Sequence, residues 1–419
     1  MGKTFAEKIL ALKSGKDSVV AGEIVTVSPD IVMSHDNSAA IAKKFKQIGI
    51  NKVKYPEKIV IPLDHCVPAA TEKYATNHKE IREFVQEQKI ENFYDINTGV
   101  CHQVLPEKGH ILPGTLVLGA DSHTTTYGAF GTFAAGIGRS EVASIWATDE
   151  IWLRVPETIK INIEGKIPSG IYPKDIILHI IGDVGADGAL YKAVEFSGKV
   201  IWDMDIGGRM TLCNMAVEMG AKIGYVEPDE RTMQWLAPRS NKKYEIIKSD
   251  LNAEFEKIID YDISKLKPQI ACPHTVDNVK PVSEVAGTKI NQALIGTCTN
   301  GRLEDLKVAS KILRGRKISN RVRLLVFPAS MEVFAQAMEL GILQILVKSG
   351  AVIMNPGCGP CLGAHEGALA PGEVCLSTAN RNFKGRMGCK EAEIYLASPA
   401  TVAISSLYGE ITDVRGDLK

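Results

Sequence analysis

Two cysteines in a C-x-x-C spacing, Cys358 and Cys361, are the residues of this chain best suited to bind a metal. They lie in a loop rich in Gly and Pro at 355–363, directly after an apolar run at 351–354 that predicts a buried strand. Redox dithiols, zinc sites and iron–sulfur sites all use this spacing. A third cysteine, Cys298, follows another apolar run. Three thiolates favour a [4Fe–4S] cluster with one iron free to act as a Lewis acid, and zinc is the alternative.

Histidines and carboxylates form a second set of chemically capable residues. Asp64 and His65 end a predicted strand at 58–63, and Asp121, Ser122 and His123 end another at 114–120, while His102 lies between them in the chain. A carboxylate beside an imidazole raises its basicity and fixes its tautomer, as proton transfer near neutral pH requires. Adjacent residues of a strand point to opposite sides, so Asp64 and His65 can pair only in a turn. A single histidine is more often structural, but three such groups favour acid–base chemistry.

The remaining candidates have ordinary structural explanations as well. Arg381 and Arg386 lie in a loop with few other charges. A guanidinium there suits carboxylate recognition, and a solvated surface pair is the alternative. The local pattern places Glu218 on the surface of a helix. The other cysteines are predicted to pack in the core, as free cysteine commonly does: Cys66, Cys101, Cys213, Cys272, Cys375 and Cys389.

Apolar strand-like runs alternate with helical patterns over most of the chain, which predicts an α/β fold. We expect three units, at 1–155, 156–285 and 286–419, with a polar linker at 265–285. Within the first unit, the Gly-rich segment 128–138 is predicted to open a helix through Trp146. The polar motifs follow predicted strands, and ligand sites form at that edge of an open α/β sheet. The motifs of the first and third units are therefore expected to face each other across a cleft.

Composition argues against several function classes. The 419 residues carry 49 basic and 49 acidic side chains and no dense basic block, which argues against a nucleic-acid or membrane-surface role. No apolar stretch approaches the roughly 20 residues of a membrane span. Thr4 and Glu7 predict a capped helix at the N-terminus rather than a targeting signal. Nine cysteines without such a signal indicate reduced thiols and a cytoplasmic location.

Six motifs in order resemble the aconitase superfamily, over nearly the whole chain. They are Asp64-His65, 101–103, 119–124, 296–300, 355–363 and 380–386. The resemblance implies three α/β/α domains around a [4Fe–4S] cluster, with the family's swivel domain absent. The cluster ligands would be Cys298, Cys358 and Cys361, leaving one iron open.

The resemblance also implies the acid–base residues. His65, oriented by Asp64, is expected to protonate the leaving hydroxyl of the substrate. Two further imidazole–carboxylate pairs are expected to support it: His102 with Asp121, and His123 with Glu218. Glu218 becomes a candidate only through its matching motif.

Substrate contacts are implied in the same way. Ser122 and Arg381 would contact the substrate, and Arg386 would pair with its carboxylate. His35 stands where aconitases carry a substrate-binding glutamine. Two residues match family asparagines near the cluster: Asn214 and Asn380.

A missing motif predicts a partner. Single-chain aconitases continue into a swivel domain whose G-S-S-R-E-like motif carries the serine that removes the substrate proton. This sequence ends at Lys419 and contains no such motif. We therefore expect a separate small subunit to carry the serine, in a heterodimer or heterotetramer, and the chain to be active only with it.

Within the superfamily, the resemblance is closest to the short archaeal-type large subunits of isopropylmalate isomerases, a form that homoaconitases share. It implies a hydro-lyase that converts 2-isopropylmalate to 3-isopropylmalate through 2-isopropylmaleate in leucine biosynthesis. Homocitrate, citraconate and dimethylmalate chemistry are the alternatives of the same class. An electron-transfer protein would normally offer its cluster four cysteines. An RNA-binding regulator would need a basic stripe.

Overall fold

A five-stranded sheet forms the first part of the computed structural model, which describes residues 2–363 and 365–417. All neighbouring strands in it are parallel. Its strands are rich in Ile, Val and Leu that are buried on both faces, as expected when helices cover both sides. The strand order is β4 (Phe93–Tyr94), β3 (Ile59–Pro62), β2 (Ile31–Met33), β5 (Leu116–Gly119) and β6 (Phe133–Gly136).

Helices α2 (Ser38–Gln47), α3 (Glu72–Gln88) and α5 (Arg139–Thr148) pack together beside this sheet. The ring of Trp146 in α5 stacks on Phe84 of α3, with 5.2 Å between ring centroids. The first helix, α1 (Phe5–Ser14), begins with the capping box that Thr4 and Glu7 predict. A separate two-stranded sheet pairs β1 (Ile24–Val27) with β7 (Ile151–Arg154).

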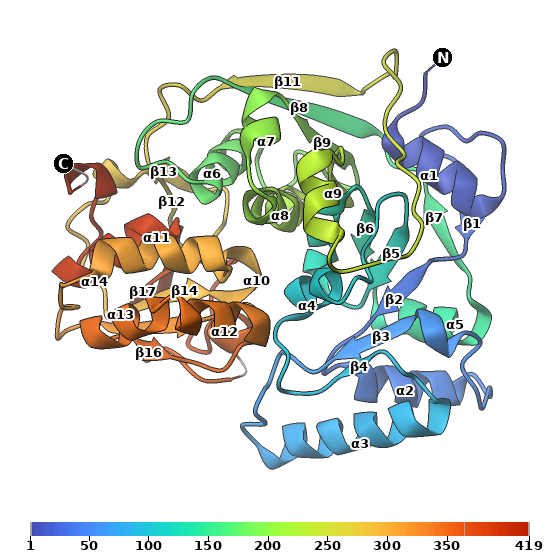
Figure 1. Cartoon of the computed structure of the whole chain (residues 1–419), viewed down its shortest axis with the longest axis horizontal. Helices are drawn as coiled ribbons and strands as arrows, with labels where there is room; N and C mark the ends of the chain where they lie inside the picture. The colour runs from blue at the N-terminus through green and yellow to red at the C-terminus, as the bar shows by residue number, and fades with distance from the viewer. Residues whose placement is uncertain (1, 364, 418–419) are drawn as a thin grey trace.

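A four-stranded parallel sheet follows, in which β8 and β11 run along the upper edge of Figure 1. Its order is β10 (Ile223–Val226), β9 (Ala193–Ser197), β8 (Thr158–Glu164) and β11 (Lys257–Asp262). The helices of this segment are α6 (Pro173–Val184), α7 (Lys199–Asp203), α8 (Ile206–Met215), η3 (Ala216–Met219) and α9 (Glu230–Leu236).

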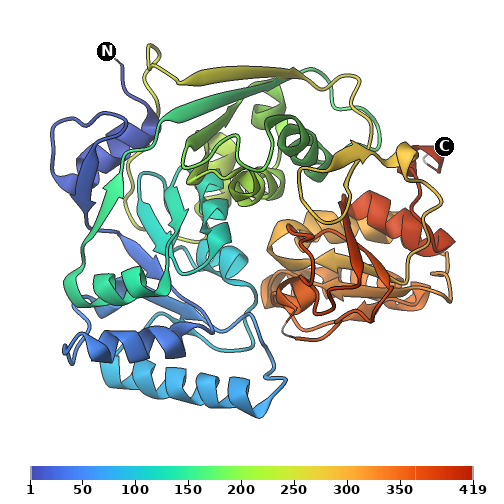
Figure 2. The ribbon, with the colours of Figure 1, turned by 180° about the vertical axis from the view of Figure 1, so that it is seen from behind.

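The third sheet has seven strands and forms a lobe on the left of Figure 1 and on the right of Figure 2. Its order is β13 (Val279–Pro281), β12 (Gln269–Ala271), β18 (Glu393–Ala397), β17 (Val374–Ser377), β14 (Gln292–Gly296), β15 (Arg323–Phe327) and β16 (Val352–Ile353). Its helices are α10 (Thr297–Asn300), α11 (Leu303–Leu313), α12 (Met331–Glu339), α13 (Ile342–Ser349) and α14 (Pro399–Tyr408). Among the described residues of this sheet, β12 pairs antiparallel with both β13 and β18, and the other neighbouring strands are parallel.

Two segments differ from their prediction. The predicted helix through Trp146 forms as α5, with Gly138 as its N-cap, but most of the Gly-rich stretch 128–138 ends η2 (Ser122–Phe130) and then forms β6. Glycine at 128 is required because an added Cβ would lie 1.6 Å from the carbonyl oxygen of Gly224. The polar stretch 265–285 contributes β12 and β13 to the seven-stranded sheet, so the pairing of that sheet begins before residue 286. The division at 155 and 285 stays a prediction.

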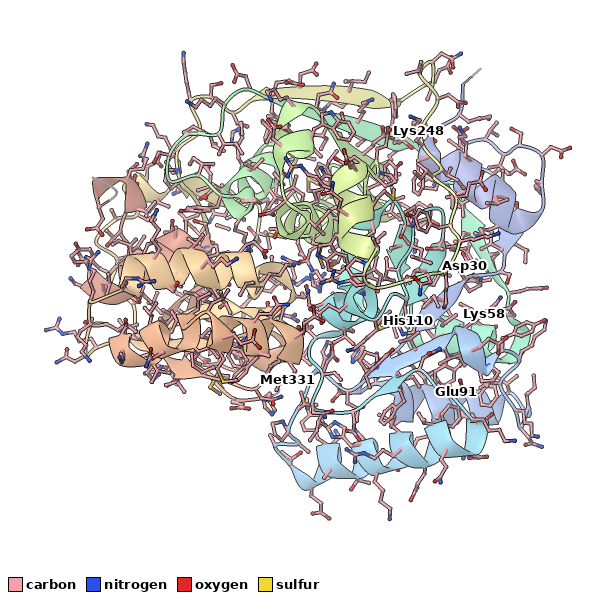
Figure 3. The ribbon with its side chains drawn as sticks, viewed as in Figure 1. Asp30, Lys58, Glu91, His110, Lys248 and Met331 are labelled. Carbon is pink, nitrogen blue, oxygen red and sulfur yellow. The ribbon has the colours of Figure 1, made fainter. Side chains whose placement is uncertain are left out.

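The carboxyl ends of the strands of the first sheet point toward the third sheet. Figure 3 labels Asp30, Lys58 and Glu91, which precede β2, β3 and β4, and all three lie on the right of that view. Met331, at the start of α12, lies on the side of the third lobe that faces this sheet. Its backbone N–H donates to the carbonyl of Thr98 at 2.8 Å. The carboxyl ends of β2, β3 and β5 are therefore directed at the lobe that carries the three candidate cysteines.

One contiguous apolar core joins the sheets. It includes Val60 of β3, Ile161 of β8 and Leu294 of β14, all buried. No helix in the described part of the chain is long and apolar enough to cross a membrane.

Candidate functional site

The turn after β3 places Asp64 and His65 together. The Nδ1 of His65 lies 2.6 Å from Oδ1 of Asp64, and both side chains are buried. The second carboxylate oxygen of Asp64 accepts the backbone N–H of Cys101 at 2.7 Å. The Asp64 carboxylate is therefore fixed at both oxygens, and it holds the imidazole ring of His65 in one orientation.

Asp121, at the end of β5, links the other two histidines to His65. Its Oδ1 lies 2.7 Å from Nε2 of His102, and its Oδ2 lies 3.6 Å from Nε2 of His65. The backbone N–H of His123 donates to the same carboxylate at 2.8 Å. Burial works against the charge, but hydrogen bonds from the three histidines lower the pKa of Asp121 well below its ordinary value. One carboxylate thus organises three imidazoles.

Burial alone would lower the pKa of His65. The charge of Asp64 and the hydrogen bonds to Asp121 and Asp64 outweigh burial and raise this pKa well above 6.5. The ring of His35 stacks on that of His65, with 3.8 Å between centroids. Burial, reinforced by the charge of His65, lowers the pKa of His35 to about 4. At neutral pH the geometry therefore pairs a protonated imidazole with a neutral one.

Glu218 is buried, unlike the surface residue that its local pattern predicts. It lies in η3, and its Oε1 lies 2.8 Å from Nε2 of His123. The Nε of Arg381 donates to both oxygens of this carboxylate, at 2.8 and 3.1 Å. Burial opposes the charge of Glu218, but its bond to His123 and the charges of His123 and Arg381 lower its pKa. The interaction joins residues from all three predicted units.

The three candidate cysteines meet at strand ends of the seven-stranded sheet. Cys298 follows β14 in α10, and Cys358 and Cys361 lie in the loop after β16. All three are buried and none forms a disulfide. The backbone N–H of Cys358 donates to the carbonyl of Asp64 at 2.9 Å. This bond sets the cysteine loop directly against the turn that carries His65.

Amide donors aim at the sulfur of Cys298. The Nδ2 atoms of Asn214 and Asn380 lie 3.2 and 3.4 Å from its Sγ. A guanidinium nitrogen of Arg386 lies 3.7 Å from the Sγ of Cys361. Such donors stabilise negative sulfur, and the same arrangement tunes iron–sulfur clusters. Three buried sulfurs with donors around them therefore fit a cluster held by three protein ligands.

The three thiols differ in acidity. Burial raises the pKa of Cys298 to about 12. A hydrogen bond from the Cys358 thiol, together with the charge of Arg386, lowers the pKa of Cys361 well below its ordinary value. The positive charge of Arg386 beside Cys361 therefore favours the thiolate form that binds a metal.

Four groups around His65 have ligand atoms within 4.8 Å of one another: His35, Asp36, Asp64 and His65. Their carboxylates accept backbone N–H groups, from Asp64, His65 and Cys66 onto Asp36 and from Cys101 onto Asp64. These hydrogen bonds indicate that the two carboxylates hold the turn after β3 and do not bind a metal ion. A cavity of about 330 Å³ adjoins the site and is lined in part by Asp121 and Ser122.

Sequence reasoning missed several residues that support the site. Asp36 follows β2 as Asp64 follows β3, so its place after an apolar run was the available signal. Lys174 is fully buried and donates to the carbonyls of Thr378 and Ala379, which precede Asn380. Arg302 donates to the carbonyls of Cys298 and Thr299 at 2.7 and 2.6 Å. Their contacts come from packing between distant segments, and their local sequence shows no motif.

Comparison with known proteins gives the family. The model of the aconitase family (aconitate hydratase) matches residues 7–288 and 280–409. A probable 3-isopropylmalate dehydratase large subunit of Methanothermobacter thermautotrophicus is 53% identical over 420 residues, covering 100% of both chains. A probable methanogen homoaconitase large subunit of Methanosarcina mazei is 54% identical over 387 residues, covering 92% of this chain and 98% of the relative.

A solved structure shares the fold. The aconitase X of Thermococcus kodakaraensis matches with a TM-score of 0.50 and 12% identity, covering 90% of this chain and 88% of that one. The prediction of an α/β fold of aconitase type is thus confirmed. Family model, relatives and fold agree over the length of the sequence, and the chain therefore belongs to the aconitase family.

Proposed function

We propose that this chain is the large, cluster-bearing subunit of a 3-isopropylmalate dehydratase. It would interconvert 2-isopropylmalate and 3-isopropylmalate through 2-isopropylmaleate, by dehydration and rehydration, in leucine biosynthesis. The observation that carries the reaction class is the meeting of the Asp64–His65 turn with the cysteine loop through the Cys358 N–H. Relatives from M. thermautotrophicus and Methanopyrus kandleri, 53% and 51% identical, carry this enzyme's name and support the substrate.

A [4Fe–4S] cluster would be held by Cys298, Cys358 and Cys361. When bound, it supplies a Lewis-acidic iron without a protein ligand, which can polarise a substrate hydroxyl. Asn214 and Asn380 would donate to the sulfur of Cys298 and keep the cluster environment polar. The short distances from these two amides to the sulfur of Cys298 support this role.

His65 would donate the proton that the hydroxyl needs in order to leave as water. Its raised pKa keeps the imidazole protonated at neutral pH, and Asp64 holds Nδ1 so that Nε2 is the acidic position. His102, Asp121, His123 and Glu218 would form the supporting network around it.

The substrate's carboxylates would meet Arg381, Arg386 and Ser122. The Nε of Arg386 is buried and has no hydrogen-bond partner within residues 2–363 and 365–417, so a donor is available to an anionic ligand. Arg381 uses Nε for Glu218, which leaves its terminal nitrogens for substrate. His35, neutral and stacked on His65, would complete the wall of the site.

A small swivel subunit would supply the serine that removes the α-proton. The names of the relatives as large subunits support such a partner. The proton removed by the serine and the proton donated by His65 would then come from different polypeptides.

Homoaconitase is the second candidate, because the M. mazei relative with that name is 54% identical. The two enzymes differ in the substituent of the substrate and not in the acid–base groups. The test is to assemble the chain with its small subunit and compare kcat/KM for 2-isopropylmalate, homocitrate and citramalate. We expect 2-isopropylmalate to be preferred at least tenfold. Preference for homocitrate would replace the proposed substrate and retain the mechanism.

The proposed acid is tested separately by His65→Asn in the same complex. We expect an unchanged cluster content, since His65 is not a ligand, and a kcat lower by about 10²–10⁴-fold. Normal turnover in this variant would exclude His65 as the acid.

A further inference from the structure

The carboxylate of Asp36 collects the backbone N–H groups of the turn that carries His65. Its Oδ2 accepts from the N–H of Asp64 at 2.9 Å and of His65 at 2.8 Å, and its Oδ1 accepts from Cys66 at 3.1 Å. Asp36 is 8% exposed and follows β2, the strand beside β3. Three consecutive amides thus converge on one side chain that does not belong to their own strand.

His78 of α3 provides a side-chain partner for the Asp36 carboxylate. Its Nε2 lies 2.8 Å from Oδ1 of Asp36, and it is 3% exposed within α3. With this contact and the three amides, four hydrogen bonds satisfy the buried carboxylate, which is what an ionised acid in a protein interior requires. The acid is therefore held from two sides, by the turn after β3 and by α3.

We propose that Asp36, held by His78, is a positioning residue that fixes the Asp64–His65 turn so that the His65 ring faces the substrate. This rests on the proposed function, in which His65 is the acid. Asp36 itself bonds only backbone N–H groups and His78 among the described residues. It acts through the turn and makes no contact that a catalytic residue would make.

The geometry explains why a turn is needed here. On an extended strand, Asp64 and His65 would point to opposite faces, and the 2.6 Å contact between them could not form. Bringing the N–H groups of residues 64, 65 and 66 onto one anion forces the backbone to curl at the end of β3. Loss of the anion would release the curl, and displacements of about 1 Å in a catalytic group can cost about 100-fold in rate.

The first experiment compares Asp36→Asn with Asp30→Asn in the complex with the small subunit. Asp30 precedes the same strand at its opposite end, where it also accepts a backbone N–H, that of Leu116 at 2.7 Å (Figure 3). We expect Asp36→Asn to lower kcat about 10–100-fold, with KM within about threefold and unchanged iron content. Asp30→Asn should keep kcat within about twofold. Equal effects of the two substitutions on kcat would overturn the proposal.

A second pair of variants covers the case in which Asp36→Asn does not fold. His78→Leu leaves the carboxylate and its three amides but removes the side-chain partner, whereas His78→Gln keeps an N–H donor. We expect His78→Leu to lower kcat about 3–10-fold and His78→Gln to restore most of it. Equal kcat values for these two variants would contradict the role of His78.

A readout without substrate separates this inference from the proposed function. In ¹⁵N-histidine-labelled large subunit, the Nδ1 proton shared by His65 and Asp64 should give a downfield NMR signal, assigned by its absence in His65→Asn. We expect the signal to be lost or shifted in Asp36→Asn and retained in Asp30→Asn. An unchanged signal in Asp36→Asn would overturn the inference, whether or not the wild-type complex dehydrates isopropylmalate.

Discussion

His65 carries a proton at neutral pH because two carboxylates face it. Asp64 and Asp121 raise its pKa well above 6.5, although burial opposes this. An acid catalyst loses activity as pH rises through its pKa. The alkaline limb of kcat/KM should therefore lie well above pH 6.5 in the wild-type complex.

Asp121→Asn removes one of these charges, so the alkaline limb should move to lower pH. The measurement is the pH profile of kcat/KM for both forms, with Asp30→Asn as a control that should leave the limb in place. A limb that stays fixed in Asp121→Asn would show that another group titrates.

For individual residues, the sequence predicted the cysteines and the His–Asp groups of the site and missed residues that support them. The cysteine spacing and the His–Asp groups pointed to the site because such residues seldom stand so close together in a sequence. His78 and Lys174 gave no such signal, because a single basic residue is common, and Asp36 offered only its place after an apolar run, beside His35. Their function depends on partners far away in the sequence, such as the carbonyl of Ala379 for Lys174.

At the scale of elements, the cysteine loop and the turn after β3 are in direct contact. An added Cβ on Gly357 would lie 2.8 Å from the carbonyl oxygen of Asp64 and 3.1 Å from Val67. Gly357→Ala should therefore push the two segments apart, at a cost of about 1–3 kcal/mol. We expect faster loss of iron in air and lower kcat, followed by absorbance and by activity. Gly416→Ala, where nothing lies within 4 Å of the added Cβ, should behave as wild type.

The contact between α4 (Cys101–Glu107) and α12 contains a buried acid. Glu107 accepts hydrogen bonds from Gln103 and Ser330 at 2.8 Å, yet burial raises its pKa from 4.5 to about 7. Between these two values the folded chain holds a proton that the unfolded chain releases, so the contribution of Glu107 to stability falls as pH rises from 4.5 to 7.

Glu107→Gln has no charge to bury. It should match wild type near pH 5 and exceed it in free energy of unfolding by about 1–3 kcal/mol at pH 8. Urea unfolding at both pH values measures this, with the exposed Glu339→Gln as control. A gain that is the same at both pH values would assign the effect to packing.

Sequence patterns located most of the elements near the site. The strands at 59–62, 116–119 and 352–353 fall where apolar runs predict them. Buried parallel strands such as the first two need continuous apolar residues. The segment 128–138 was predicted only in part: Gly138 does cap the helix through Trp146, but Gly128 serves a close approach to the Gly224 carbonyl. Such an approach is set by a strand about a hundred positions away and leaves no local pattern.

At the scale of the molecule, the site exists only where all three sheets meet. His65 comes from the first, Glu218 from the segment of the second, and Arg381 and the cysteines from the third. Sequence could predict that strand ends face a cleft, since ligand sites form there. It could not predict the bond between Arg381 and Glu218, because that distance depends on how separate segments pack.

In the proposed enzyme this chain holds the cluster and the acid, while a second polypeptide supplies the base. The most direct measurement is the dehydration of 2-isopropylmalate by the anaerobically purified chain, first alone and then with increasing amounts of the small subunit. We expect the chain alone to be brown and to bind iron but to show no turnover, and we expect activity to saturate as the complex forms. Full turnover by the isolated chain would contradict this expectation.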